Sequence, residues 1–201
     1  MNHIIVEDKL RDTNPVPVVI AFTPNYFIPA STCLYSIFAS LDTEEQMHVI
    51  CLLSEELPDR LKQKIQLIGG ERAQYSFINL QGRLQNIYID AKYTEAASYR
   101  LLLPDLLPEY DKVMYIDCDI IVRNNLVKLY RSVDLGNHYL AAVFEAPMDF
   151  QLGHLKAIGC HPDEYVNSGF LIMNLELMRR DNMVEKFIDA SKADYLEFPD
   201  Q

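Results

Sequence analysis

The stretch "KVMYIDCDIIVRNNL", residues 112–126, sets Asp117 and Asp119 directly after an apolar run that predicts a buried strand. Side chains alternate along a strand, so we expect both carboxylates on one side and Cys118 turned into the core. An unpaired buried carboxylate is costly, and two adjacent carboxylates repel each other. A positive species must therefore lie nearby. A divalent metal would serve, because hard carboxylate oxygens suit Mn²⁺ or Mg²⁺.

Strand and helix signals alternate along the rest of the chain. We expect strands at residues 16–22, 47–53, 75–80, 112–116, 139–145 and 169–175. Helices are expected at 29–41, 58–68, 94–103 and from 181 to about 198, with Asp181 as the N-cap of the last. This alternation predicts an α/β fold, a mostly parallel sheet with helices on both faces. Ligands of such open sheets bind beyond the carboxyl ends of the strands, where Asp117 and Asp119 would lie.

Composition narrows the class of protein. The 201 residues are 49% apolar, enough for one α/β-sized domain. A net charge of −11 argues against nucleic-acid binding, but a bound cation would still let an acidic protein take a nucleotide. The four cysteines show no CxxC spacing and no secretory signal is evident, so we expect reduced thiols and a cytoplasmic location. No apolar run is long enough to span a bilayer.

An Asp-x-Asp pair after a strand has other uses besides metal binding. Aspartates there also cap helices or form turns. An EF-hand loop is excluded, because Ile121 would occupy its fifth position and no glycine follows. A phosphatase that forms an aspartyl-phosphate on Asp117 also places Asp-x-Asp after an apolar strand, and it stays an alternative.

Four segments, in their order and spacing, resemble glycosyltransferase family 8. They are "AFTPNYFIPASTCLYSIFAS" (21–40), "YRLLLPDLLPEYDKVMYIDCDIIVRNNLVKLY" (99–130), "NSGFLIMNLELMRRDN" (167–182) and the terminal "DQ". The resemblance runs from about Pro17 to Gln201 and implies a GT-A-type, Rossmann-like fold. It also implies a metal-dependent, retaining hexosyltransferase that moves glucose or galactose from UDP-glucose or UDP-galactose. The acceptor would be a hydroxyl of a glycan, a lipopolysaccharide or a glycoprotein.

The same resemblance implies a donor pocket. Its residues would be Ala21, Thr23, Asn25, Tyr26, Arg100, Cys118 and Ser168. Tyr26 would stack on the uracil, and Arg100 would reach the sugar nucleotide. Without the resemblance, Tyr26 is interpreted as an ordinary buried tyrosine and Arg100 as part of a surface ion pair. Thr23 and Pro24 replace the family's usual Asp-Asp, which alters one uracil contact.

Metal and catalytic roles follow from the resemblance as well. Asp117 and Asp119 would bind Mn²⁺, or Mg²⁺, which bridges the diphosphate. Near the transferred sugar and the acceptor we expect Glu145, Asn167, Asp200 and Gln201. Val166 replaces the family's usual aromatic residue before Asn167.

We expect residues 1–201 to form a single nucleotide-sugar-binding domain that lacks the C-terminal part of the family domain. That part carries the family's third metal ligand, a histidine, and a phosphate-binding Gly/Lys segment. Any peripheral membrane association would also come through this missing C-terminal part. None of the histidines occupies that place: His3, His48, His138, His154 and His161. His154 and His161 are interpreted as surface or acceptor-side residues. A non-catalytic nucleotide-binding module is therefore the alternative to an enzyme, and the sequence carries no signal for oligomeric state.

Overall fold

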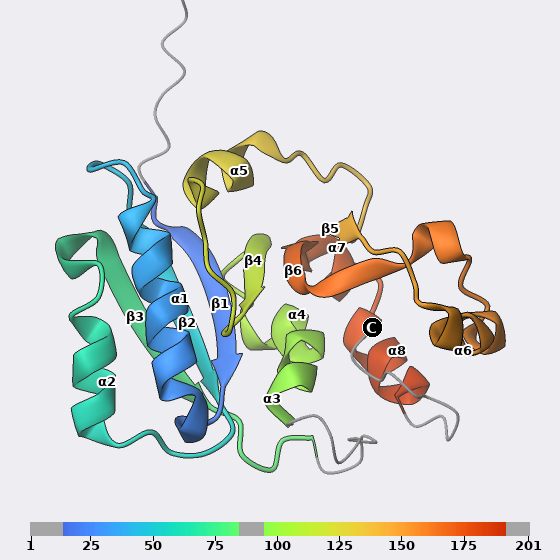
Figure 1. The fold of residues 1–201 in the computed structure, drawn as a ribbon, viewed down its shortest axis with the longest axis horizontal. Helices are drawn as coiled ribbons and strands as arrows, with labels where there is room; N and C mark the ends of the chain where they lie inside the picture. The colour runs from blue at the N-terminus through green and yellow to red at the C-terminus, as the bar shows by residue number, and fades with distance from the viewer. Residues whose placement is uncertain (1–13, 85–94, 192–201) are drawn as a thin grey trace, which may run out of the picture.

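The computed structural model describes residues 14–84 and 95–191. Its six strands form one sheet in the order β3-β2-β1-β4-β6-β5 (Figure 1). The strands are β1 Val16–Phe22, β2 Met47–Leu53, β3 Ala73–Asn79, β4 Lys112–Asp117, β5 Leu140–Phe144 and β6 Val166–Asn174. The first four in this order are parallel, whereas β6 runs antiparallel to both β4 and β5. The predicted α/β architecture with a mostly parallel sheet is confirmed.

Two hydrophobic layers cover the two faces of the sheet, and alternation along β1 shows why. Val18, Ile20 and Phe22 belong to one buried cluster, while Val19 and Ala21 belong to the other. A strand that is buried on both faces has no polar side, which is the origin of the continuous apolar run "VPVVIAF".

Each layer has its own helices. The first cluster includes residues of α1 (Phe27–Ala39), α2 (Asp59–Gln66) and α5 (Leu126–Ser132). The second includes residues of α3 (Glu95–Ser98), the 3-10 helix η3 (Tyr99–Leu102), α4 (Leu103–Leu106) and α7 (Leu175–Arg180), and α8 (Met183–Ala190) packs against it. Shorter elements complete the described chain: η1 (Pro24–Tyr26), η2 (Gly70–Arg72), η4 (Asp149–Gln151), α6 (Leu152–Ile158) and η5 (Pro162–Glu164). None of the helices in these residues is long and apolar enough to cross a membrane.

The β6–α7 region differs from its prediction. Strand β6 begins at Val166, so Asn167 and Ser168 lie inside the strand instead of before it. The unpredicted helix α7 then takes residues 175–180, and Asp181 ends it. The N-cap of α8 is Asn182, in the left-handed conformation with φ 53°, so the N-cap prediction for Asp181 is wrong. Asp181 instead accepts a hydrogen bond from the Tyr139 hydroxyl at 2.8 Å.

Three other helical segments also depart from prediction. The helix expected at 94–103 is divided into α3, η3 and α4 and extends to residue 106, and its first residue lies outside the described chain. Helices α5 and α6 were not predicted. His154 in α6 is buried, with 6% of its surface exposed, so its interpretation as a surface residue is wrong, whereas His161 is exposed. The predicted extension of the last helix beyond residue 191 lies outside the described residues.

The sheet order places the carboxyl ends of β1 and β4 side by side. From β1 the chain moves outward to β2 and β3, then returns to β4 on the opposite flank of β1. Such a reversal point opens a crevice between the loops that leave the two strands, and ligands bind there. Ala21 near the end of β1 is paired with Asp117 at the end of β4. The predicted metal-binding aspartates therefore lie at the reversal point.

Gly69 and Gly70 offer a test of packing at the turn before β3. Gly69 has φ 84°, and a Cβ there would lie 2.7 Å from Phe38 Cδ1 and 2.8 Å from Ala73 Cβ. Gly70 has φ 57° but no atom within 4 Å of its Cβ position. We expect Gly69→Ala to destabilise the protein by more than about 1 kcal/mol and Gly70→Ala by less, as measured by urea unfolding. Equal losses would contradict the packing at this turn.

Candidate active site

Asp117, the last residue of β4, lies between two small residues of the neighbouring strands. On one side the parallel register pairs it with Ala21. On the other side, one step beyond the pair Ile116 and Phe170, the antiparallel register sets it opposite Gly169. The preceding row on the same face is large and apolar, with Tyr115 between Val19 and Leu171. The sheet thus changes from a packed core to an open polar end within two residues of β4.

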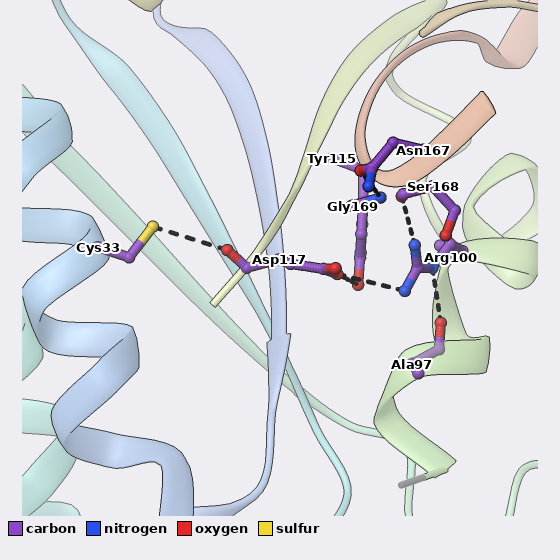
Figure 2. Close-up of polar contacts among 8 residues, drawn as sticks. All are labelled: Cys33, Ala97, Arg100, Tyr115, Asp117, Asn167, Ser168 and Gly169. Atoms are coloured by element: carbon purple, nitrogen blue, oxygen red, sulfur yellow. Dashed lines mark hydrogen bonds and ion pairs between the residues drawn. The ribbon is translucent and has the colours of Figure 1, made fainter. Parts of the chain in front are cut away.

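Arg100 supplies the positive charge that the opening stretch of sequence requires. Its guanidinium Nη2 lies 3.2 Å from Asp117 Oδ1, and only 4% of the residue is exposed. Nε donates to the Ala97 carbonyl at 2.7 Å, and Nη1 donates to the Ser168 carbonyl (Figure 2). The guanidinium carbon also lies 4.5 Å from the centre of the Tyr115 ring, a cation–π arrangement. The interpretation of Arg100 as part of a surface ion pair is therefore wrong.

The two oxygens of Asp117 have different surroundings. Oδ1 accepts hydrogen bonds from Arg100 Nη2 and, at 3.0 Å, from the Tyr115 hydroxyl. Burial raises the pKa of Tyr115, so this hydroxyl stays protonated and acts as a donor. Oδ2 has no hydrogen bond to any residue in the described ranges, and it lies 2.6 Å from the position that a Cβ on Gly169 would take. The carboxylate is thus held through one oxygen and open at the other.

Cys118 and Asp119 complete the Asp-x-Asp sequence. The Cys118 side chain lies in the core cluster on the α1 face, as predicted. Burial, with the charges of Asp119 and Asp117, raises the pKa of the Cys118 thiol to about 12, so the buried thiol is protonated at neutral pH. Since its side chain lies in the core, any contact of Cys118 with a bound sugar nucleotide would come from its backbone. The Asp119 side chain is exposed and forms no hydrogen bond or ion pair with the described residues.

The chemistry of these donors fits a hard divalent cation. Asp117 Oδ2 and the Asp119 carboxylate are oxygen ligands that Mn²⁺ and Mg²⁺ accept, and both cations commonly complete their coordination with substrate phosphates and water. Within residues 14–84 and 95–191, no group of three or more His, Cys, Asp or Glu side chains is placed to hold a metal. The two aspartates could therefore supply part of a coordination sphere.

The antiparallel strand β6 brings a second set of polar residues to this end of the sheet. Asn167 Oδ1 accepts from the Gly169 backbone N–H at 3.0 Å, and its amide nitrogen donates to Glu145 Oε2 at 3.1 Å. Ser168 is tied to Arg100 through its carbonyl. Ser168 therefore joins the Asp117 network through Arg100, and Glu145 and Asn167 form a hydrogen-bonded pair beside it at Gly169. The predicted site residues Asp200 and Gln201 lie outside the described residues.

The loop after β1 forms the other side of the candidate site. Thr23 is half-buried, and Asn25 and Tyr26 in η1 are exposed, with 44% of Tyr26 accessible. The interpretation of Tyr26 as a buried tyrosine is therefore wrong, and its ring is available to a ligand. Ala21 is buried, so it contributes its small size next to Asp117.

Two residues of the site were not predicted from the sequence. Tyr115 precedes Asp117 by two positions, so alternation could have placed it on the same face. Gly169 belongs to the Asn-Ser-Gly segment, but its position opposite Asp117 depends on the register between β4 and β6.

Solved structures share this architecture. The apo structure of the WbbM bifunctional glycosyltransferase superposes over 100% of this chain and 37% of that one, with a TM-score of 0.79 and 24% identity. The galactosyltransferase LgtC, in complex with donor and acceptor sugar analogs, superposes over 92% of this chain and 68% of that one, with a TM-score of 0.75 and 25% identity. The fold is thus that of the GT-A glycosyltransferases.

The family follows from the sequence comparison. The profile of Glycosyl transferase family 8 matches residues 17–201, so the chain belongs to this family. General stress protein A of Bacillus subtilis (strain 168) is 24% identical over 199 residues, which are 96% of this chain and 68% of that protein. Glycosyltransferase GlyA of Streptococcus pneumoniae serotype 4 is 35% identical over 102 residues, 51% of this chain and 13% of that protein. Lipopolysaccharide 1,3-galactosyltransferase of Salmonella typhimurium is 24% identical over 113 residues, 55% of this chain and 34% of that protein. The chain spans about a third or less of the last two relatives.

The Arg100 network predicts a specific loss of stability. Arg100→Met leaves the Ser168 carbonyl without its donor and Asp117 without its cation. We expect the unfolding free energy to fall by about 1–3 kcal/mol, the usual cost of leaving a buried polar group unsatisfied. The loss should not be larger, because 37% of the Asp117 side chain is exposed and solvent screens its charge. The matched control is Arg180→Met, which removes an exposed pair with Asp181 and should leave the urea midpoint nearly unchanged. Equal shifts in the two variants would refute the network's role.

Proposed function

We propose that the protein transfers glucose or galactose from a UDP-sugar to an acceptor hydroxyl, with retention of the anomeric configuration. Mn²⁺ or Mg²⁺ would bind at Asp117 and Asp119. One observation carries this proposal: at the reversal point of a family 8 fold, Asp117 is restrained through one oxygen, and neither its other oxygen nor the nearby Asp119 carboxylate has a partner among the described residues. Phosphate-bridging cations in enzymes are held by such oxygen donors.

In this proposal the donor lies across the ends of β1 and β4. Tyr26 offers its exposed ring for stacking on the uracil, and Thr23 and Asn25 supply polar groups beside it. The diphosphate extends toward Asp117 and Asp119, where a divalent cation would offset its charge and that of the leaving UDP.

The β6 side of the site would hold the sugar and the acceptor. Glu145 and Asn167 are hydrogen-bonded to each other, which orients both side chains at this end of the sheet. Arg100 neutralises Asp117 on the side away from Oδ2 and fixes the Ser168 backbone. The bond from the anomeric carbon to the diphosphate would break through a loose, oxocarbenium-like transition state, with its electron pair leaving on UDP. The acceptor oxygen would attack from the same face, and its hydroxyl proton would pass to the leaving phosphate oxygen. Roles for Asp200 and Gln201 remain predictions.

The acceptor class and the location are part of the proposal. A relative named as a lipopolysaccharide galactosyltransferase supports a glycan or glycolipid acceptor. All four cysteines are unpaired thiols, which supports a reducing cytoplasm, where UDP-sugars would be supplied. The single sheet supports one nucleotide-sugar domain over the matched residues.

The metal site predicts that UDP binds more tightly with Mn²⁺ than with EDTA. We expect Asp117→Asn and Asp119→Ala to remove at least about 1.4 kcal/mol of that gain, a tenfold change in Kd, in titration calorimetry. Asparagine at 117 keeps an acceptor for Arg100 and Tyr115, so the network is spared. Asp105→Ala, an exposed aspartate of α4, is the control. A UDP affinity that ignores metal and both substitutions would reject the site. Mn²⁺-dependent release of sugar from a panel of UDP-sugars then separates an enzyme from a binding module.

Base recognition gives an independent test. Tyr26→Ala should weaken UDP binding by about 1–3 kcal/mol, the usual contribution of a base–aromatic stack, and Tyr26→Phe should retain most of it. Stability should change little, because 44% of the residue is exposed. Tyr35→Ala on α1, where the tyrosine is 70% exposed, serves as the control. An unchanged UDP affinity in Tyr26→Ala would place the base elsewhere.

A further inference from the structure

Gly169 occupies a strand position where its backbone conformation does not require glycine. It lies within β6, and it is absent from the described residues with left-handed φ values, which include Gly69, Gly136 and Gly159. Conformational freedom therefore does not explain a glycine here, and in a strand interior glycine costs stability. The explanation must come from the space around the missing side chain.

The Asp117 carboxylate occupies that space. A Cβ on Gly169 would lie 2.6 Å from Asp117 Oδ2 and 3.2 Å from its Cγ, well inside van der Waals contact. It would also lie 3.1 Å from Asn167 Oδ1, the atom that accepts the Gly169 backbone N–H. Even the smallest side chain would therefore displace both Asp117 and Asn167.

The Asp117 carboxylate cannot rotate away from such a side chain, because its other contacts hold it in place. Oδ1 is held by the Arg100 guanidinium and the Tyr115 hydroxyl, and both donors are fixed in place by burial. The Asp117 backbone is paired to Ala21 in the sheet, and its carbonyl faces the Cys33 thiol at 3.8 Å on the other side. Figure 2 shows the side chain of Asp117 extended from the tip of β4 between these groups.

We propose that Tyr115 and Gly169 are positioning residues that make Asp117 a one-oxygen metal ligand. Tyr115, with Arg100, occupies Oδ1 so that Asp117 cannot bind a cation through both oxygens. Gly169 leaves the room that Oδ2 itself occupies, so that this oxygen stays in place to meet a cation. This inference rests on the proposed metal-dependent function and assigns the residues that set its ligand geometry.

The geometry has a consequence for metal choice. Mg²⁺ demands near-ideal octahedral coordination by single oxygens, whereas Ca²⁺ accepts bidentate carboxylates in larger, flexible spheres. A carboxylate with one oxygen committed to the protein therefore favours Mn²⁺ and Mg²⁺ over Ca²⁺. When the Tyr115 hydroxyl is removed, Asp117 loses one of the two donors on Oδ1, so this preference should weaken.

The test measures binding of MnCl₂, MgCl₂ and CaCl₂ in the presence of UDP, by titration calorimetry and by the Mn²⁺ electron paramagnetic resonance signal. Gly169→Ala and Tyr115→Phe should each weaken Mn²⁺·UDP binding by about 10–100-fold, the usual cost of losing support for a metal ligand. UDP binding in EDTA should stay unchanged, and the ratio of Mn²⁺ to Ca²⁺ affinity should fall in Tyr115→Phe. Phenylalanine keeps the ring that packs under Arg100 and removes only the hydroxyl.

Matched controls are present in the chain. Gly153→Ala adds a Cβ in helix α6, in open space with no neighbouring residue within 4 Å. Tyr75→Phe removes a hydroxyl that donates to the Ile68 carbonyl, and it lies in the edge strand β3, away from Asp117. Both should bind Mn²⁺·UDP as the wild type does. Thermal unfolding of every variant shows which proteins are folded. If Gly169→Ala does not fold, Tyr115→Phe decides.

The outcomes separate this inference from the proposed function. Wild-type binding of UDP that ignores metal would overturn both. Metal-dependent wild-type binding with wild-type Mn²⁺ affinity in folded Tyr115→Phe would overturn the positioning role alone. In an Asp117→Asn background, Tyr115→Phe should add no further loss of Mn²⁺ affinity, because the ligand that it positions is already removed. Additive losses would also overturn the inference.

Discussion

The contact between Arg100 and Asp117 is the constraint on which the site depends. Only 4% of Arg100 is exposed, so the donors of its guanidinium must be satisfied, and they bond to Ala97, Ser168 and Asp117. These partners come from α3, β6 and β4, so one side chain ties the helical layer to two strands of the sheet. The same contact restrains the carboxylate that ends β4. The stability of this face and the geometry of the site therefore depend on the same contacts. A substitution that breaks these contacts should lower the stability and also displace the site carboxylate.

The small residues around the network are as necessary as the charges. Asp117 lies between Ala21 and Gly169, one row beyond a layer that is filled by Val19, Tyr115 and Leu171. A large residue in either flanking position would close the end of the sheet with apolar packing. The reversal point between β1 and β4 can thus hold a ligand, because the core ends there in small residues. Polar groups of β4, of β6 and of the helical layer that carries Arg100 meet at this point.

A cation from the protein also changes what a metal is required to do. The sequence predicts that a positive species offsets the paired aspartates Asp117 and Asp119, and a divalent metal is the species expected there. In the structure, Arg100 satisfies Asp117, and Asp119 is exposed to solvent and needs no partner to fold. The chain can therefore form this end of the sheet before any metal arrives, and the proposed cation would act in binding and catalysis.

By itself, the sequence determined the parts of the protein that depend on local pattern. Strands 16–22 and 47–53 match β1 and β2 at both ends, because burial on two faces produces an unbroken apolar run. The alternation of side chains along the strand correctly predicted that Cys118 faces the core. The order of strands and helices correctly predicted a mostly parallel sheet. Only the tertiary structure decided that Arg100 is buried, that Asn167 and Ser168 lie within β6, and that Gly169 faces Asp117. The Arg100 contacts join residues 17 and 68 positions apart. Contacts at that separation depend on the register between β4 and β6 and on how the helical layer packs, and neither leaves a periodic signal in the sequence of one segment.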